Sequence, residues 1–247
     1  MNLALIGYGK MGKLLEQLAP LYDFNVTLKL DEFNNANYEG LTAENFRGVD
    51  AAIEFSIPSA TVRNIELASA LGVNLVVGTT GWLDQLEHVK QTVETNGTGL
   101  VWSPNYSIGV NVFSRLVSEA AKLLATQPEY GAWAWEIHHI TKKDAPSGTL
   151  LKLVDDMKSA GYAKEIDVSS SRAGAHPGTH EIGFDSSSDT ITLRHSARSR
   201  EGFARGALKA AQWITGKKGF YEFSDILFKS FVPSHDRKEV IRSEPRP

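Results

Sequence analysis

The chain has 247 residues, of which 42% are hydrophobic and 22% are charged, and its formal net charge is -3. This composition is typical of a globular protein of one large or two modest domains, and the charge gives no general attraction to nucleic acid or to an acidic membrane. The sequence has no cysteine, which excludes disulfides, thiolate metal sites and a cysteine nucleophile. It shows no signal-peptide pattern and no apolar run long enough to cross a bilayer, so we expect a cytoplasmic protein with no nucleic-acid or membrane partner, and we predict no metal site.

The first predicted element is a short strand over residues 3–6, which leads into a glycine-rich turn. Glycines 7, 9 and 12 have the spacing of the dinucleotide-binding fingerprint, and leucines recur at helical spacing after them. Such a turn lets the backbone approach a pyrophosphate at a helix N-terminus. We therefore predict that this loop binds a dinucleotide cofactor through Gly7, Tyr8, Gly9, Lys10, Met11 and Gly12.

The second predicted strand covers residues 24–30 and ends at an acidic pair, Asp31 and Glu32. Asp31 lies 19 residues after the last glycine of the loop (31 minus 12), close to the offset of the acidic residue that binds a cofactor ribose. We predict that Asp31 makes this contact and that Glu32 is a solvated turn residue, although the sequence leaves the choice between them open. Lys10 and Lys29 could instead attract a 2′-phosphate, so NADH and NADPH both stay open.

Through the rest of the first half, short strand-like runs alternate with segments whose apolar residues have helical spacing. The runs cover residues 51–55, 74–77 and 99–102, with helices predicted from Pro58 and from Trp82. Repeated strand–helix units indicate an α/β fold with a Rossmann-like, doubly wound parallel sheet, in which ligands bind beyond the carboxyl ends of the strands. The residues at those ends are candidate cofactor contacts: Phe55, Gly78, Thr79, Thr80, Ser103, Pro104, Asn105 and Tyr106.

The second half begins with a predicted helix over residues 110–125 and then alternates with period two. The alternating runs are residues 132–137, 179–184 and 190–195. They predict a C-terminal α+β domain with a mixed sheet and with helices on one face, one of them at residues 202–215. We therefore expect a dinucleotide-binding domain at 1–106 and 217–247, and a substrate-binding domain at 107–216. The apolar segment 223–231 is expected to pack back onto the first domain.

Residues 136–149 form the most informative stretch, Glu-Ile-His-His-Ile-Thr-Lys-Lys-Asp-Ala-Pro-Ser-Gly-Thr. Two imidazoles and two ammonium groups precede a helix start, whose free N–H groups could hold a carboxylate or a phosphate. We interpret the stretch as a site for a small anionic molecule rather than as a structural strand-to-helix connection. Because side chains alternate along a strand, His138 and His139 should face opposite ways. Five other cationic residues could line the same pocket, although each taken alone fits a structural or solvated role better: Arg172, His176, His180, His195 and Arg198.

Several stretches resemble the 4-hydroxy-tetrahydrodipicolinate reductase family, also called the dihydrodipicolinate reductase family, of the diaminopimelate route to lysine. They are residues 7–12, 78–81, 105–111 and 136–149. The resemblance implies that His138 transfers a proton and that Lys142 donates one. It also implies that the cyclic dicarboxylate substrate is bound by His139, Gly148 and Thr149, with the backbone of Ser147 beside them. The cofactor contacts that it implies are residues 7–12, 78–80 and 103–106.

The reaction implied by this resemblance is a reduction of 4-hydroxy-tetrahydrodipicolinate to tetrahydrodipicolinate by NADH or NADPH, with loss of water. Negative charge that builds on the conjugated ring would be quenched by a proton from His138 or Lys142, and the resemblance leaves open which atom each serves. We expect the domains to close about segments near Tyr106 and Lys217. The family is usually tetrameric through its second-domain sheet, so the resemblance implies a homotetramer.

Two alternatives belong to other functional classes. An amino-acid dehydrogenase, acting on aspartate or diaminopimelate, would use the same glycine loop but would not predict the spacing from Lys142 to Thr149. A non-catalytic NAD(P)-sensing regulator would keep the fold without the chemistry, and replacing His138 or Lys142 would then leave its ligand binding and output unchanged.

Overall fold

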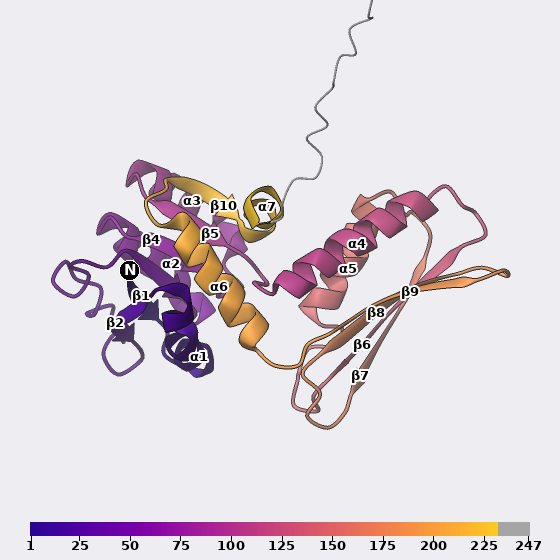
Figure 1. The fold of residues 1–247 in the computed structure, drawn as a ribbon, viewed down its shortest axis with the longest axis horizontal. Helices are drawn as coiled ribbons and strands as arrows, with labels where there is room; N and C mark the ends of the chain where they lie inside the picture. Colours follow the sequence, from indigo (N-terminus) through magenta and orange to yellow (C-terminus); the bar gives the residue numbers. More distant parts are fainter. Residues whose placement is uncertain (232–247) are drawn as a thin grey trace, which may run out of the picture.

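The protein folds into two lobes that lie side by side (Figure 1). The computed structural model describes residues 1–231, so residues 232–247 of the predicted segment 217–247 lie outside the described part. The first lobe is built on a six-stranded sheet and the second on a four-stranded sheet. None of the helices in residues 1–231 is both long enough and apolar enough to cross a membrane.

The first sheet confirms the predicted doubly wound architecture. Its strands are β1 (Asn2–Ile6), β2 (Asn25–Leu30), β3 (Ala51–Glu54), β4 (Asn74–Val77), β5 (Gly99–Trp102) and β10 (Gly219–Glu222). They run in the order β10-β5-β4-β3-β1-β2, and every pair is parallel. Every residue of β3 and β4 is buried, as expected for central strands covered on both faces. The strand β10 was not predicted from the sequence.

The helices of the first lobe begin close to where the sequence predicts. They are α1 (Lys10–Leu18), with a 3-10 turn η1 (Ala19–Tyr22) after it, α2 (Pro58–Ala70) and α3 (Leu86–Thr95). Pro58 occupies the first turn of α2, where its missing N–H costs nothing. The helix predicted from Trp82 starts as a short 3-10 turn, η2 (Leu83–Gln85), and becomes α3 at Leu86.

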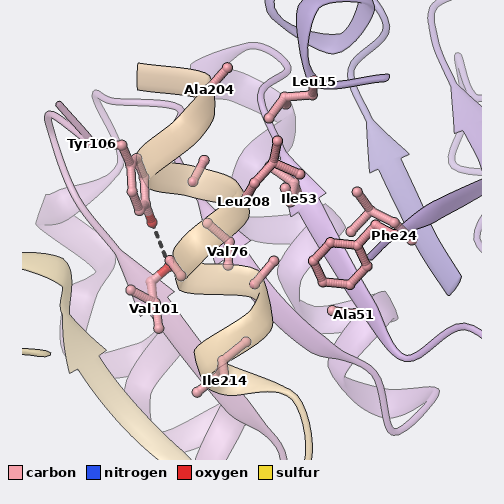
Figure 2. Close-up of a cluster of buried hydrophobic side chains, with 14 of the residues drawn as sticks. Leu15, Phe24, Ala51, Ile53, Val76, Val101, Tyr106, Ala204, Leu208 and Ile214 are labelled. Atoms are coloured by element: carbon pink, nitrogen blue, oxygen red, sulfur yellow. Dashed lines mark hydrogen bonds between the residues drawn. The ribbon is translucent and has the colours of Figure 1, made fainter. Parts of the chain in front are cut away.

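The helix α6 (Glu201–Ile214) packs on the six-stranded sheet, so its predicted place on the mixed sheet is wrong. Figure 2 shows Ala204, Leu208 and Ile214 of this helix against the sheet residues Val76 and Val101. The alternation of small and branched residues along α6 marks a buried face, but it does not say which sheet that face meets. The chain therefore returns to the first lobe before residue 201. The sequence predicts this return at residue 217.

The segment after β10 also packs on the first lobe, as predicted for residues 223–231. It forms α7 (Phe223–Ile226) and a π-helical turn, η3 (Leu227–Phe231). The ring of Phe223 is fully buried, with its centroid 4.9 Å from that of Tyr106. This end of the first lobe therefore lies close to the segment at which the chain crosses to the second lobe.

The second lobe is a mixed sheet with two helices on one face, as the sequence predicts (Figure 1). Its strands are β6 (Gly131–His138), β7 (Ile166–Arg172), β8 (Thr179–Asp185) and β9 (Thr190–Ser196), in the order β7-β6-β8-β9. Only the pair β6–β7 is parallel. The helices are α4 (Ile108–Leu124) and α5 (Gly148–Ser159). The serine-rich edge strand β7 was not predicted, because its middle residues lack the apolar alternation of a half-buried strand.

Candidate active site

The carboxyl ends of the parallel strands meet at one rim of the first sheet, and the predicted cofactor segments follow them directly. Gly7 follows β1, Asp31 follows β2, Phe55 follows β3, Gly78 follows β4 and Ser103 follows β5. Residues separated by almost one hundred positions are therefore brought to the same edge. In doubly wound sheets this edge binds the ligand, at the point where the strand order reverses.

The glycine loop has the shape that a dinucleotide requires. Gly7 has φ +97°, and a Cβ atom on it would lie 2.1 Å from the carbonyl oxygen of Phe55. A Cβ on Gly12 would lie 2.4 Å from the carbonyl oxygen of Gly7, so α1 packs tightly on its strand only because residue 12 is glycine. A Cβ on Gly9 would meet no atom within 4 Å. The first and third glycines thus serve packing, whereas Gly9 leaves open space at the N-terminus of α1 for a phosphate.

The side chains around the glycine loop are partly engaged already. The hydroxyl of Tyr8 donates to the carboxylate of Glu16, and the ammonium of Lys29 lies 3.0 Å from the same carboxylate. Lys29, one of the two lysines considered for a 2′-phosphate, is therefore paired, whereas Lys10 is exposed. Asp31 accepts the N–H of Phe33 at 2.9 Å in a turn at the end of β2.

Tyr106 holds the sheet together and does not offer its side chain to a cofactor. Its hydroxyl donates to the carbonyl oxygens of Val77 and Val101, at 3.0 and 2.8 Å, and the residue is 1% exposed. Figure 2 shows the contact with Val101. The predicted cofactor contact of Tyr106 could therefore involve its backbone, because its side chain is buried in the sheet. The neighbouring turn is held by the hydroxyl of Ser103 on the carbonyl of Asn105, at 2.8 Å.

A cavity of about 750 Å³ lies between the two lobes. The first lobe contributes Thr80, Ser103, Pro104 and Asn105 to its lining, and the second contributes His138, His139, Lys142, Ser147, Gly148 and Thr149. The glycine loop is not part of this lining. Part of the predicted cofactor site and the whole predicted substrate site therefore face one space.

The two neighbouring histidines both line the cavity, although they have different neighbours. The strand β6 ends at His138, and His139 already lies in the following turn, where the period of two no longer applies. His138 is buried, whereas the Nδ1 atom of His139 lies 2.8 Å from the hydroxyl of Thr141. Lys142 also reaches the cavity and is paired with Asp144 at 2.8 Å.

Glu136 organises this site, a role that the sequence analysis missed. Its side chain is fully buried, and its Oε1 atom accepts the N–H of Ser147 at 2.9 Å and a guanidinium N–H of Arg172 at 2.8 Å. The hydroxyl of Ser147 donates to Oε2 of the same carboxylate. Burial opposes ionisation, but hydrogen bonds from His180, Ser147 and Arg172 outweigh it and hold the pKa of Glu136 well below its usual range. Glu136 is therefore a buried carboxylate whose charge is balanced.

The imidazole of His138 stands beside this carboxylate and is uncharged near neutral pH. Its Nδ1 atom lies 3.5 Å from Oε2 of Glu136, and Nε2 of His180 lies 3.4 Å from the same oxygen. Burial lowers the pKa of His138 to about 4, against the opposing effect of Glu136 and with help from the charges of His180, Lys142 and Arg172. The ring packs against Gly178, where a Cβ atom would lie 2.9 Å from Nε2 of His138.

The start of α5 offers donors to a ligand at two of the three predicted residues. Ser147 is the N-cap of the helix and accepts the N–H of Leu150 at 3.2 Å. Because its own N–H and hydroxyl are both given to Glu136, Ser147 has no free donor for a substrate carboxylate. Within the described residues, no acceptor takes the N–H groups of Gly148 and Thr149, and a Cβ on Gly148 would meet no atom within 4 Å. These two groups are the free donors of the helix start.

Cross-strand register explains which of the other cationic residues reach the site. Glu136 pairs with His180, and His180 pairs with His195, so these three side chains lie in one row across the sheet. Both His180 and His195 line the cavity. A sequence reading could have found the row only with the strand register in hand. Arg198 is exposed, and His176 accepts the N–H of Gly178 at 3.3 Å.

Glu136, His138 and His180 also have the donor types of a divalent-metal site. One ligand atom from each lies within 4.8 Å of the others. The carboxylate, however, is already neutralised by Arg172, and Ser147 donates to the oxygen that a metal would need. Both oxygens of this carboxylate therefore already have hydrogen-bond partners within the protein.

Family models for dihydrodipicolinate reductase match almost the whole chain. The model of the N-terminal part matches residues 1–106, and the model of the C-terminal part matches residues 109–227. A 4-hydroxy-tetrahydrodipicolinate reductase of Christiangramia forsetii is 34% identical over 242 residues, covering 94% of this chain and 99% of the relative. One of Methanosarcina mazei is 35% identical over 262 residues, covering 92% and 98%.

A solved structure has the same fold. It is the dipicolinate-bound dihydrodipicolinate reductase of Paenisporosarcina sp. TG-14, with a TM-score of 0.75 at 23% sequence identity. The match covers 92% of this chain and 99% of that one. Both lobes, and not just the dinucleotide-binding one, therefore have counterparts in the solved enzyme.

Proposed function

Since the chain belongs to the dihydrodipicolinate reductase family of nicotinamide-dependent oxidoreductases, we propose that it reduces 4-hydroxy-tetrahydrodipicolinate to tetrahydrodipicolinate, with loss of water, in the synthesis of diaminopimelate and lysine. The observation that carries the proposal is the shared cavity, which puts the ends of β4 and β5 opposite His138, Lys142 and the start of α5. Neither lobe alone holds both the coenzyme rim and the proton donors.

The coenzyme fits the rim of the first sheet, at the open space over Gly9 and the segments that follow β4 and β5. When bound there, reduced nicotinamide supplies a hydride to the substrate ring. The N–H groups of Gly148 and Thr149 bind one carboxylate of the substrate, and His139 lies on the same side of the cavity. These contacts hold the ring in place for the transfer.

Protons come from the second lobe. His138 is uncharged while the cavity holds no ligand, because burial lowers its pKa to about 4. A dicarboxylate beside it would raise that pKa, since an opposite charge favours the protonated imidazole. The substrate would thus charge its own proton donor, while Lys142, which lines the same cavity, supplies the second proton-bearing group.

The test is oxidation of NADH or NADPH in the presence of 4-hydroxy-tetrahydrodipicolinate generated in situ. We expect turnover by the wild type and a fall of about 10²-fold or more in kcat for Lys142→Gln, with coenzyme affinity preserved. Lys143→Gln is the matched control, because Lys143 is the exposed neighbour and does not line the cavity. Turnover of aspartate or diaminopimelate by oxidative deamination, with none on the cyclic substrate, would establish the amino-acid dehydrogenase instead. Coenzyme binding with no turnover of any of these would leave the sensing regulator.

The proposed coenzyme is NADH or NADPH, and a titration of each decides the preference. Asp31 at the end of β2 suits the free hydroxyls of the NADH ribose, and the pairing of Lys29 with Glu16 leaves Lys10 as the nearby cation for a 2′-phosphate. Quenching of tryptophan fluorescence reports the affinity for each coenzyme. We place the reaction in the cytoplasm, a proposal supported by the absence of cysteine from the sequence.

We also propose a homotetramer that forms through the open face of the four-stranded sheet. Within the described residues, α4 and α5 lie on one face of the sheet (Figure 1), the face that carries Ala134. The alternate residues Trp133, Trp135 and Ile137 of β6 lie on the other face. Such a row of aromatic and aliphatic groups at the centre of an uncovered sheet is typical of a subunit interface. Light scattering of the wild type and of Trp135→Glu measures the mass of the assembly. The same mass for the variant and the wild type would contradict this interface.

A further inference from the structure

Glu54 carries a second buried carboxyl group, in the first lobe, that the proposed reaction does not use. It is the last residue of β3 and is 0% exposed. Phe55 and Ser56 follow it at the rim of the sheet. The N–H of Gly78 donates to the backbone carbonyl of Glu54 at 2.9 Å. Glu54 therefore lies directly beneath two of the segments that border the coenzyme site.

The carboxyl group of Glu54 has polar but uncharged neighbours. Its Oε1 atom accepts the N–H and the hydroxyl of Ser56, the former at 3.2 Å, and it also lies 3.4 Å from the amide nitrogen of Asn64. That amide also donates to Ser56 Oγ at 3.1 Å. Three buried oxygens have no hydrogen-bond partner within residues 1–231: Oε2 of Glu54, Oδ1 of Asn64 and Oγ1 of Thr79. The hydroxyl of Thr79 can donate to the carboxyl group of Glu54, whereas Oδ1 of Asn64 can only accept, so a proton on Glu54 would supply a donor that this oxygen lacks.

Within residues 1–231, this carboxyl group forms no ion pair with a cationic side chain. Strands β1 and β4 present Ile6 and Val77 at the paired positions, and helix α2 presents Asn64. The titratable group on the adjoining segment is the phenol of Tyr106, which burial keeps uncharged by raising its pKa. An ionised carboxylate here would be buried without a counter-charge, which costs several kcal/mol.

The second lobe shows what a buried charged glutamate needs. Glu136 is as fully buried as Glu54, but it has the guanidinium of Arg172 at 2.8 Å and two imidazoles beside it. Glu54 has serine, threonine and asparagine in their place, and burial raises its pKa, whereas the pKa of Glu136 is lowered. The two lobes thus hold the same residue in opposite charge states.

We propose that Glu54 is held as an uncharged carboxylic acid and, through Ser56 and Thr79, positions the coenzyme-binding rim of the first sheet. Glu54 is a positioning residue, since the residues that follow it, and not its own carboxyl group, border the coenzyme. Ser56 is fixed by two hydrogen bonds to the carboxyl group. Thr79 lies in the turn after β4, and its carbonyl accepts the indole N–H of Trp82 at 2.8 Å. The inference rests on the proposed function in taking the ligand of this rim to be a nicotinamide coenzyme.

The test compares two variants that separate shape from charge. Glu54→Gln keeps the size of the side chain and supplies a permanent, uncharged donor, whereas Glu54→Ala removes every contact. Affinities for NADH and NADPH are measured by tryptophan quenching, and thermal midpoints are measured without ligand between about pH 5 and about pH 9. We expect Glu54→Gln to bind coenzyme within about threefold of the wild type, and Glu54→Ala to bind it about tenfold or more weakly, because the donors of Ser56 and Asn64 lose their acceptor.

The thermal midpoints test the charge state directly. The folded pKa of Glu54 is raised above the ordinary 4.5, so above that pH the unfolded chain releases a proton that the folded protein keeps. The wild type should therefore lose stability relative to Glu54→Gln as the pH rises from about 4.5 towards the raised pKa. A merely structural contact would give a difference that does not change with pH.

Two results would overturn the proposal. One is coenzyme binding by Glu54→Gln as weak as that of Glu54→Ala, which would mean that an ionised carboxylate is needed. The other is a stability difference between wild type and Glu54→Gln that is constant with pH. If the wild type binds neither coenzyme, the proposed function fails, while the thermal midpoints still decide the charge state of Glu54.

Discussion

Gly178 fixes the position of the imidazole that the proposed reaction depends on, so Gly178→Ala should damage catalysis far more than folding. The residue has φ +141°, a region that alanine rarely adopts, and the new Cβ would lie 2.9 Å from Nε2 of His138 and 3.0 Å from its Cδ2. The backbone strain costs about 1–3 kcal/mol. A Cβ needs about 3.4 Å or more for an ordinary contact, so the ring or the loop must shift by several tenths of an ångström. A displacement of about 1 Å can lower turnover by about 10²-fold.

The matched control is Gly174→Ala in the same loop. Gly174 has φ +52°, and its Cβ would meet no atom within 4 Å, so this change adds backbone strain of about 1 kcal/mol without touching the imidazole. Steady-state kinetics and urea unfolding of both variants separate the two effects. We expect kcat to fall by about 10–100-fold for Gly178→Ala and to stay within about twofold of the wild type for Gly174→Ala. Equal losses of kcat for the two variants would show that loop strain, and not the imidazole, limits the reaction.

Three further predictions address the two halves of the site. Glu136→Gln should lower the free energy of unfolding by about 3 kcal/mol, as measured in urea, because the guanidinium of Arg172 loses its buried counter-charge; an effect below about 1 kcal/mol would contradict the assigned charge. As the pH falls from 6.5 to about 4, His138 should lower the free energy of unfolding by up to about 3 kcal/mol, because its imidazole takes up a proton in the unfolded chain but stays neutral when buried. Urea unfolding of His138→Asn across the same pH range should not show this loss of stability. Gly9→Ala should leave the thermal midpoint unchanged and weaken coenzyme binding about tenfold in a fluorescence titration, since its Cβ meets no protein atom but fills the space left for a phosphate; unchanged affinity would mean that the phosphate lies elsewhere.

The parallel half of the fold is predictable because its signals are local. The strands β1, β3, β4 and β5 are short, mostly apolar runs with glycine, proline or a polar cluster after them. The strand ends must share one edge in any doubly wound sheet. That rule places Gly7, Gly78 and Ser103 at one edge from the sequence alone. The strand β10 was not predicted because it has only four residues and because its partner β5 lies more than one hundred positions away in the sequence.

The placement of α6 shows what local patterns leave undetermined. Its sequence has a buried stripe of alanine and leucine, which would suit either sheet. The deciding contact is long-range: a Cβ on Gly206 would lie 1.8 Å from the carbonyl oxygen of Tyr106, so the helix approaches the end of the first-lobe segment as closely as backbone allows. No feature within the helix itself encodes that neighbour.

The site divides in the same way between local and long-range information. The block from His138 to Thr149 is contiguous, so its residue types and spacing already indicated a substrate site. Glu136 was visible in the same block, but its importance depends on Arg172, from the parallel neighbour strand, and on His180, from the antiparallel one. A carboxylate acquires a role only when its partners are known, and strand register supplied them.

The two segments in which the chain crosses between the lobes are in contact with each other. Tyr106 ends the outgoing passage against Gly206, and a Cβ on Gly202 would lie 3.3 Å from the hydroxyl of Ser107. If the angle between the lobes changes, these adjoining segments are the expected hinge, because both connections between the lobes pass through them. In that motion, residues close to the hinge, such as His195, would move little, whereas residues at the far side of the cavity would move most.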